Sequence, residues 1–182
     1  MASRLTKIYT RTGDAGTTGM ADGTRVDKDD MLIQTIGEFD ELNSQLAVLG
    51  VHVPASFVGS IKKIQNELFD VGAEISMGPA IITQDHIDWL EQSVDMILQS
   101  LTPLEEFILP GGGLAASHCH VARAVCRRAE RSLVALNKVR PVNDDLLAYV
   151  NRLSDYLFVL ARAISKEAGE EEVYWQSSRL KK

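Results

Sequence analysis

The sequence predicts an all-α protein, a five-helix up-and-down bundle. Over five separate stretches of the chain, apolar residues recur at the three- and four-residue spacing of one helix face. Most connections between these stretches are short, and short connections place consecutive helices antiparallel. No stretch shows strand-like alternation, and the low aromatic content of 6% with only five prolines suits helices.

The five helices are expected at residues 31–50, 56–77, 84–101, 113–137 and 143–168. The first should end at Gly50 and the second at Gly78-Pro79, because glycine readily adopts the conformation that follows a helix end. Asn143 is a favourable N-cap for the fifth. The buried face expected for the fourth helix comprises Leu114, His118, Val121, Val125, Ala129 and Leu136. That of the fifth comprises Leu146, Val150, Leu153, Leu157, Leu160 and Ile164.

At 182 residues the chain fits a single domain, residues 1–182, with a core of its own. Within it we expect an N-terminal loop (1–30), the bundle (31–168) and a C-terminal tail (169–182). The tail contains the triplet Val173-Tyr174-Trp175, which can dock back on the bundle.

Charge and composition exclude several classes of protein. The net charge of −6 argues against a nucleic-acid binder, which usually carries a basic excess. No apolar run approaches the roughly 18 residues of a membrane span, and no signal-peptide pattern is present, so the expected location is the cytoplasm. Cys119 and Cys126 lie roughly 10 Å apart on one expected helix, too far for a disulfide between them.

The fourth expected helix carries a stripe of charge. Arg123, Arg127, Glu130 and Arg131 follow at i, i+4, i+7 and i+8, on one side of the helix. One interpretation is an anion site, and the other is a salt-bridged, solvated face. Further polar pairs at helical spacing, which favour partners across a bundle or a subunit interface, are Asp40 with Asn43 and Asn151 with Asp155.

Two glycine-bearing segments also have two interpretations each. The segment 10–19 supplies hydroxyls, backbone N–H groups and one arginine, the donors that wrap phosphate, although it is equally an ordinary terminus. It lacks the Gly-Lys-Ser/Thr ending of a Walker A loop. The glycines 111–113 are either a flexible lead-in to a helix or a place where a ligand approaches the backbone.

Metal and nucleophile chemistry find little support. No histidine stands three residues after a glutamate, so the pairs of carboxylate-bridged di-iron bundles are absent from the sequence. Cys119, His120 and Cys126 fit buried helix residues better than a soft-metal site. No nucleophile elbow or triad arrangement is recognisable.

Five segments together resemble the PduO-type ATP:cob(I)alamin adenosyltransferases, in order and over nearly the whole chain. They are residues 10–18, 39–44, 107–112, 122–131 and 151–158. The resemblance implies a cobalamin adenosyltransferase-like homotrimer with its sites at subunit interfaces. Such an enzyme transfers the 5′-deoxyadenosyl group of ATP to cob(I)alamin and releases triphosphate. Cobalt(I) would then be the nucleophile.

The resemblance also implies roles for individual residues. Phe107 would occupy the lower face of the corrin and exclude the axial base, which makes four-coordinate cobalt(II) easier to reduce. Arg123 would pair with Asp40 of the partner subunit, and Arg127 would act in catalysis. Lys28 would close over the phosphates, and Mg²⁺ would bridge them. The ATP site would comprise Thr10, Arg11, Thr12, Gly13, Thr18, Gly19, Lys28, Arg127, Arg128, Ala129, Glu130, Arg131 and Asn151.

The expected partners are therefore ATP and cobalamin, with a reductase and a cobalamin-dependent mutase as candidate protein partners, and neither nucleic acid nor a membrane. Two rival functions remain. One is a regulatory bundle that binds a nucleotide or polyanion without chemistry, and the other is a purely structural trimeric bundle. Only an enzyme would produce adenosylcobalamin and triphosphate from ATP and reduced cobalamin.

Overall fold

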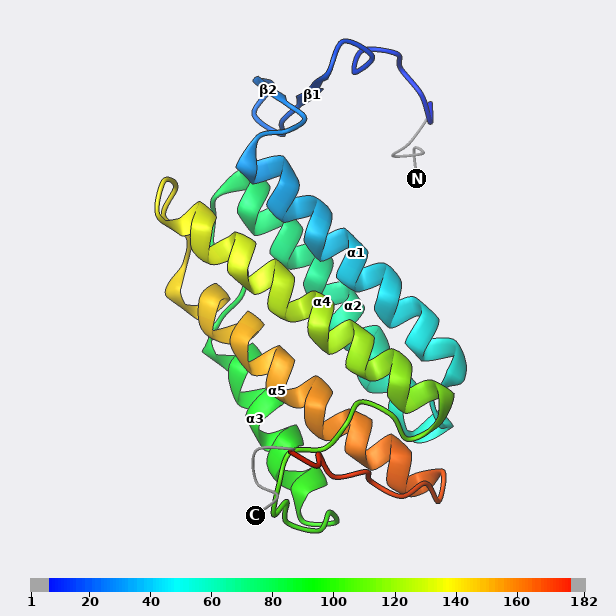
Figure 1. Ribbon diagram of the computed structural model, residues 1–182. Coiled ribbons are helices and arrows are strands. Elements are labelled where there is room, and N and C mark those ends of the chain that lie inside the picture. The colour runs from blue at the N-terminus through cyan, green and yellow to red at the C-terminus, as the bar shows by residue number, and fades with distance from the viewer. Residues whose placement is uncertain (1–6, 178–182) are drawn as a thin grey trace.

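Five helices make up the body of the computed structural model, which describes residues 7–177 (Figure 1). They are α1 (Met31–His52), α2 (Ala55–Met77), α3 (Gln84–Leu98), α4 (Gly113–Asn137) and α5 (Asp144–Glu167). Helix contacts place them in the spatial order α2, α1, α4, α5, α3. The α4–α5 pair thus lies at the centre of the bundle, and the predicted all-α, five-helix class is confirmed.

Successive helices alternate in direction along the bundle (Figure 1). The Asn143 side chain donates to the Ile82 carbonyl (2.9 Å), which joins the start of α5 to the start of α3. At the opposite end Lys166 donates to the Ser100 carbonyl, which joins the ends of the same two helices. Helices α3 and α5 therefore run parallel, and the α3–α4 connection passes beneath α5 to reach the start of α4.

Two helix ends differ from the prediction. Helix α1 continues through Gly50 and ends before Val53, which is extended (ψ 151°). The reason is Pro54, because a residue that precedes proline avoids the helical conformation. Helix α3 ends at Leu98 instead of residue 101. The predicted end of α2 at Gly78 (φ 93°) and the predicted Asn143 cap, which accepts from the Asp145 N–H (3.2 Å), are confirmed.

The buried face predicted for α4 is partly wrong. Leu114 is 62% exposed and Val121 46% exposed. Because α4 packs against both α1 and α5, its buried positions span two directions and include small residues that let the helices approach closely. The residues buried on α4 are Ala116, Cys119, His120, Ala122, Val125, Cys126, Ala129, Leu133 and Leu136.

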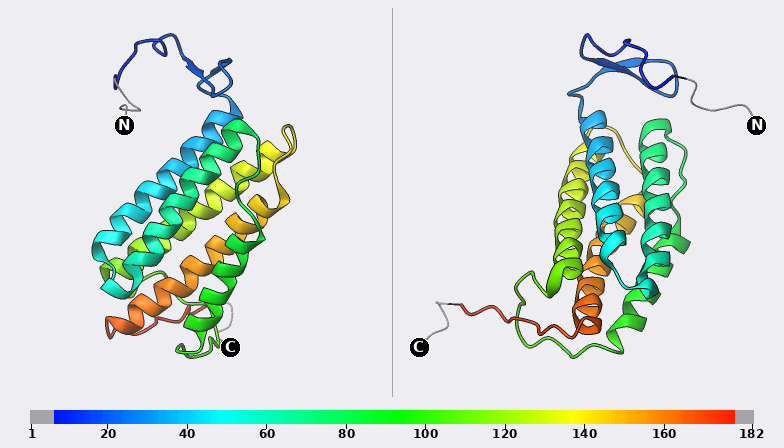
Figure 2. Two further views of the ribbon diagram at one scale, coloured as in Figure 1. Left: turned by 180° about the vertical axis from the view of Figure 1, so that it is seen from behind. Right: turned by 90° about the vertical axis from the view of Figure 1, so that its right-hand side faces the viewer.

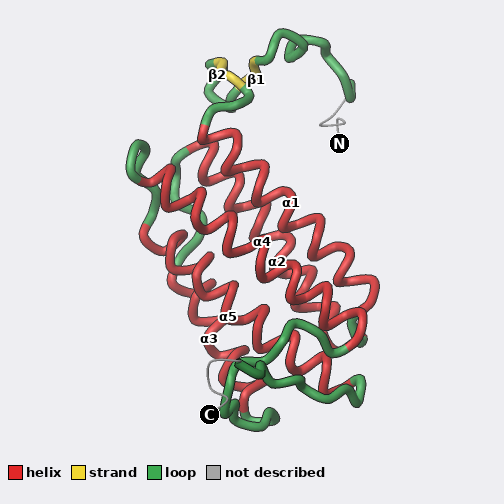
Figure 3. Tube along the Cα trace, viewed as in Figure 1, coloured by secondary structure: helices red, strands yellow, loops and turns green. Residues whose placement is uncertain are grey.

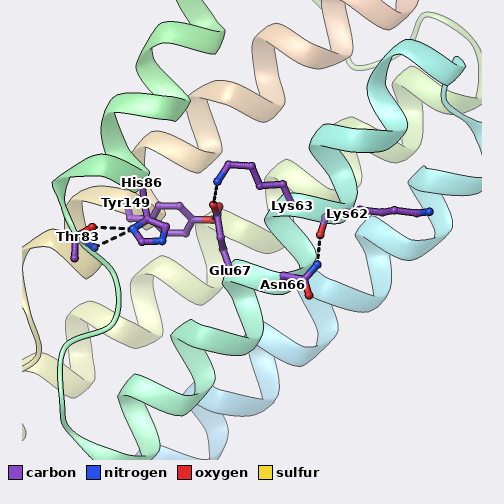
Figure 4. A network of polar contacts seen from close by, with 7 residues as sticks. All are labelled: Lys62, Lys63, Asn66, Glu67, Thr83, His86 and Tyr149. Atoms are coloured by element: carbon purple, nitrogen blue, oxygen red, sulfur yellow. Dashed lines mark hydrogen bonds and ion pairs between the residues drawn. The ribbon is translucent and has the colours of Figure 1, made fainter.

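The predicted face of α5 is confirmed at all six positions, which are buried. Two buried tyrosines extend it, of which Tyr149 donates to Glu67 Oε2 (2.8 Å) on α2. Lys63 also pairs with Glu67, so this nearly buried carboxylate has two donors and ties α2 to α5 (Figure 4). In the described part of the chain, no helix is both long and apolar enough to span a membrane.

The N-terminal segment forms a small hairpin, where the sequence predicted a loop and no strands. Strands β1 (Thr17–Gly19) and β2 (Arg25–Asp27) pair antiparallel, and Gly23 (φ 85°) lies in the turn. Three residues per strand are too few for the alternation that identifies a strand in a sequence. The hairpin projects beyond the end of the bundle at the start of α1 (Figures 2 and 3).

The C-terminal segment returns to the opposite end of the bundle (Figure 2). An isolated antiparallel bridge joins Tyr174 to Ile108 in the α3–α4 connection. The predicted docking of the tail is therefore confirmed, and its docking surface is the segment that carries Phe107.

Candidate functional site

The stripe on α4 presents two guanidiniums to solvent. Arg127 and Arg131 are exposed, and Arg131 Nη1 donates to the Arg127 carbonyl (2.9 Å). Among residues 7–177 neither arginine forms an ion pair with a carboxylate. Two neighbouring cations without a carboxylate on an acidic protein provide a local site for an anion.

Glu130 is held from the neighbouring helix. Asn151 Nδ2 of α5 donates to Glu130 Oε1 (2.9 Å), which joins the two predicted site residues across the α4–α5 contact. The amide oxygen of Asn151 is left as an acceptor for an external donor. The hydrogen bond therefore holds Glu130 and Asn151 in place on the side of α4 that also carries Arg127 and Arg131.

Two of the predicted ATP-binding positions face elsewhere in this structure. Arg128 turns toward α1 and pairs with Glu41, and Ala129 is fully buried in the core. Each step along a helix rotates the side chain by about 100°, so five consecutive residues cannot share one face. Of the run 127–131, only Arg127, Glu130 and Arg131 lie along the open side of α4.

Phe107 lines a hollow near the start of α4, where apolar and charged side chains meet. Its ring is 75% exposed, and the ring of Trp175 stands edge-on beside it at 6.3 Å. The Arg123 guanidinium lies 5.8 Å from the centre of the Phe158 ring, a cation–π distance. The hollow measures about 510 Å³ and is lined by Leu104, Glu105, Glu106, Phe107, Ile108, Arg123 and Phe158.

The sequence prediction missed Phe158 and Trp175 as site residues. Phe158 follows Asn151 at i+7, so helical spacing placed both on one face of α5. Trp175 carried no such signal, because its position depends on the path of the returning tail. Both rings border the space beside Phe107.

The arginine stripe and the hollow are in line along the α4–α5 pair. Arg123 meets Phe158, and Glu130 meets Asn151. Seven residues along α4 therefore correspond to seven residues in the reverse direction along α5, as antiparallel helices require. At 1.5 Å per residue, the two contacts lie roughly 10 Å apart. A ligand that joins a polyanion to an apolar ring system would find both within reach.

Arg123 and Asp40 have no ion-pair partner among the described residues. Arg123 Nε is buried and has no hydrogen-bond acceptor, and neither residue forms an ion pair within residues 7–177. Asp40 borders a second hollow of about 400 Å³ between α1 and α2, lined mainly by apolar side chains such as Ile36, Phe39 and Phe69. Burying a polar group without a partner is costly, so the Arg123 Nε calls for an acceptor from outside the described residues. Asp40 is exposed, and its carboxylate is free to accept from a donor on another molecule.

The predicted phosphate-binding residues of the N-terminal segment form one unit. Arg25 Nη2 donates to the Thr12 carbonyl (2.7 Å) and to Thr17 Oγ1 (2.8 Å), which ties the loop to β1. Lys28 reaches the same loop. Its Nζ lies so close to Gly13 that a Cβ atom added to this glycine would be only 3.3 Å from it. Arg25, which the sequence prediction did not select, is thus the side chain that organises this segment.

The remaining predicted residues of this segment lie on the loop and on β1. The hydroxyls of Thr10 and Thr12 are 2.8 Å apart. Between them Arg11 adopts a positive φ of 61°, which is uncommon for a residue other than glycine. Thr18 and Gly19 pair with β2. This unit projects from the end of the bundle, away from the middle of α4 where the arginines lie (Figure 1).

The glycines before α4 serve packing between helices. Gly112 has a φ of 84°, and a Cβ there would lie 2.3 Å from Ser165 Oγ. Only glycine allows the start of α4 to approach the end of α5 so closely. The close approach of the two helices therefore explains why glycine is needed at position 112, and no ligand has to be invoked.

The cysteines fit the core and not a metal site. Burial raises the pKa of the Cys119 thiol to about 12, and burial also raises the pKa of Cys126. Both thiols donate to carbonyls of α5, and both cysteines are free, as predicted. Within the described residues no group of three or more His, Cys, Asp or Glu side chains is placed to hold a metal ion.

Comparison with known proteins agrees with this geometry. Residues 8–164 match the cobalamin adenosyltransferase family. A cobalamin adenosyltransferase from Cupriavidus metallidurans is 44% identical, with 98% of this chain and 99% of that protein covered. A corrinoid adenosyltransferase from Bacillus subtilis is 36% identical, with coverage of 96% and 94%.

The fold is also that of a solved structure. A variant PduO-type ATP:corrinoid adenosyltransferase from Lactobacillus reuteri, complexed with cobalamin and ATP, superposes with a TM-score of 0.89 at 32% identity. The alignment covers 94% of this chain and all of that one. Sequence and fold together show that this chain belongs to the PduO-type ATP:corrinoid adenosyltransferases.

Proposed function

We propose that this chain transfers the 5′-deoxyadenosyl group of ATP to cob(I)alamin and thereby forms adenosylcobalamin and triphosphate. The observation that carries the proposal is the alignment along α4 of Arg127 and Arg131, which are exposed and form no ion pair among residues 7–177, with the hollow that Phe107 and Phe158 line. The related Lactobacillus reuteri structure, which holds cobalamin and ATP together, supports the same pair of ligands.

The chemistry is a substitution at carbon. The electron pair of cobalt(I) attacks C5′ of ATP, the cobalt–carbon bond forms, and the C5′–oxygen bond breaks with its electron pair leaving on triphosphate. The protein need supply no nucleophile, which fits two buried thiols of raised pKa. Its task is to hold the phosphates so that carbon, and not phosphorus, faces the metal, and such orientation is worth roughly 7 to 11 kcal/mol.

Arg127 and Arg131 would supply the electrostatic part of catalysis. Negative charge grows on the leaving oxygen as triphosphate departs, so a guanidinium aimed there binds the transition state more tightly than it binds ATP. Asn151 and Glu130 would orient the nucleotide beside them. Mg²⁺ would arrive on the phosphates, which are hard oxygen ligands of the kind that it prefers.

Phe107 would present its exposed ring to the lower face of the corrin. An apolar ring offers no donor atom to cobalt and excludes water or a nucleotide base from that position. Four-coordinate cobalt(II) is then easier to reduce to cobalt(I), because the lost donor had stabilised the higher oxidation state. Phe158 and Trp175 would widen the same apolar wall.

The proposed assembly is a homotrimer in which the N-terminal segment of one subunit covers α4 of the next. Two observations support it. The N-terminal segment projects beyond the end of its own bundle (Figure 1), and neither Arg123, whose Nε is buried, nor the exposed Asp40 forms an ion pair among residues 7–177. Several apolar residues remain exposed on α1 and α4, as at a subunit interface: Met31, Val48, Val51, Leu114, Val121 and Val134.

The reaction also defines the surroundings of the enzyme. It consumes ATP and a strongly reduced corrinoid, so we place it in the cytoplasm beside a reductase that supplies the electron. A cobalamin-dependent mutase is the proposed consumer of the product.

The direct test is incubation with ATP, Mg²⁺ and chemically reduced cobalamin. We expect adenosylcobalamin and triphosphate in equal amounts, measured by absorbance and by ion chromatography. Nucleotide binding without either product would instead favour a regulatory bundle, and no nucleotide binding would favour a structural one.

The proposed intersubunit pair predicts a charge-swap result. Asp40→Arg and Arg123→Asp should each weaken the trimer and reduce activity, because each places like charges at the interface. The double variant restores an opposite pair and should recover both properties. Mass from light scattering and the assay above measure the outcome. Wild-type mass and activity in both single variants would contradict the pair.

A further inference from the structure

The segment that carries Phe107 is held by the C-terminal segment. The Leu109 N–H donates to the Val173 carbonyl (2.8 Å), and the Trp175 N–H donates to the Phe107 carbonyl (2.7 Å). The ring of Trp175 stands edge-on to the ring of Phe107. The backbone of Phe107 is therefore positioned by residues more than sixty places later in the sequence.

A buried arginine in turn holds the C-terminal segment. Arg162 of α5 is 4% exposed, and its Nε and Nη2 donate to the two carboxylate oxygens of Glu172 (2.5 and 3.0 Å). Nη2 also donates to the Thr102 carbonyl (2.7 Å), in the connection that leads to Phe107. The Arg162 guanidinium thus joins α5 to the C-terminal segment and also to the α3–α4 connection, which carries Phe107.

A hollow separates part of the Phe107 loop from the bundle. A cavity of about 190 Å³ lies between it and the bundle, bordered by Ile108, Pro110, Gly112, His120, Arg162 and Glu172. His120 is 7% exposed, and its Nδ1 has no hydrogen-bond partner. Where this hollow separates the loop from the bundle, the loop makes fewer packing contacts, so its polar contacts contribute more to its position.

We propose that Arg162 is a positioning residue for the corrinoid reaction: its ion pair with Glu172 sets the C-terminal segment, and that segment sets the Phe107 ring. The proposal rests on the proposed function, in which Phe107 faces the corrin. Arg162 itself touches neither substrate and acts through Glu172 and the backbone of Phe107. A bidentate arginine–carboxylate pair suits this role because its two parallel bonds fix geometry as well as distance.

The test substitutes Arg162→Met, an apolar side chain of similar length, in the full-length protein. We expect the yield of four-coordinate cobalt(II) with ATP bound, measured by electron paramagnetic resonance, to fall about tenfold, which corresponds to about 1.4 kcal/mol, since a displaced ring no longer excludes a donor from the lower face of the corrin. The affinity for ATP should stay within about twofold of the wild type, because the exposed arginines on α4 are unchanged.

Arg152→Met is the matched control. Arg152 also lies on α5 and also has two carboxylate contacts, but these are with Glu91 of α3 and with Asp155 of α5, not with the C-terminal segment. It should keep the wild-type cobalt(II) spectrum. A loss of the four-coordinate signal in this control equal to that in Arg162→Met would show that any broken ion pair on α5 suffices, and would overturn the proposal.

A double variant separates positioning from general stability. If Arg162 acts through the ring, then the residual rate of adenosylcobalamin formation from cob(II)alamin and a reductant should be the same in Phe107→Ala with Arg162→Met as in Phe107→Ala alone, because the two changes remove one effect. Additive losses would refute the proposal. If Arg162→Met does not fold, Glu172→Ala takes its place, since Glu172 lies on the returning tail and its side chain is 22% exposed.

The outcomes separate this proposal from the proposed function. If the wild-type protein forms no adenosylcobalamin, the proposed function itself fails. If the wild type is active, Phe107→Ala loses the four-coordinate signal and Arg162→Met retains it, then only the positioning role of Arg162 is wrong.

Discussion

Phe107→Ala is expected to abolish the four-coordinate cobalt(II) spectrum while the affinity for ATP stays unchanged. The ring is 75% exposed, so it does little for the stability of the fold, and its removal should alter the free energy of unfolding by less than about 0.5 kcal/mol. Without the ring, water or the nucleotide base can reach the lower face of the corrin. Cobalt(II) would then keep a fifth ligand and resist reduction.

The measurement combines electron paramagnetic resonance of cobalt(II) with ATP present and calorimetry of ATP binding. Met96→Ala is the control, because Met96 is 70% exposed and lies on α3. Retention of the four-coordinate signal in Phe107→Ala would refute the role given to the ring. Loss of ATP affinity in the same variant would show that the hollow and the nucleotide site are not separable.

The sequence predicted the buried faces of some helices better than those of others. Helical periodicity placed the five helices and the buried face of α5, because one strong spacing signal is repeated over about five turns. It was only partly right on α4, where Val125, Ala129 and Leu136 are buried but Leu114 and Val121 are exposed, since a helix with two packed neighbours does not bury a single stripe.

Among the predicted site residues, too, the structure brings some together and turns others apart. Glu130 and Asn151 were selected from separate helices, and the structure brings them within 2.9 Å. Arg128 and Ala129 were included with their neighbours in one continuous motif, although helix geometry turns them toward Glu41 and the core. A motif records which residues occur together, whereas the side that each one faces depends on the rotation of the helix against its neighbours.

Contacts between distant segments were beyond what the sequence could predict. The pairs Arg162–Glu172 and Phe107–Trp175 depend on the path of the returning tail, and no local pattern encodes that path. The hairpin was missed for another reason, because strands of three residues give no measurable alternation. The tail triplet predicted docking in general terms but not the surface that receives it.

Arg127→Ala should reduce turnover at least tenfold, about 1.4 kcal/mol of lost transition-state stabilisation, while the trimer persists. Arg127 is exposed on α4 and forms no ion pair within residues 7–177, so its removal breaks no bond of the bundle. The loss should fall on kcat more than on KM. The charge that Arg127 meets increases as the C5′–oxygen bond breaks, and an interaction stronger in the transition state than in the bound substrate governs kcat.

Steady-state kinetics of adenosylcobalamin formation and light scattering of the same sample measure these expectations. The control is Arg152→Ala, which removes an arginine of α5 held by Glu91 and Asp155 and should leave turnover unchanged. An increase in KM with an unchanged kcat would assign Arg127 to ground-state binding alone. An unimpaired rate would remove it from the site and leave Arg131 as the arginine that meets the leaving triphosphate, because Arg128 is already paired with Glu41.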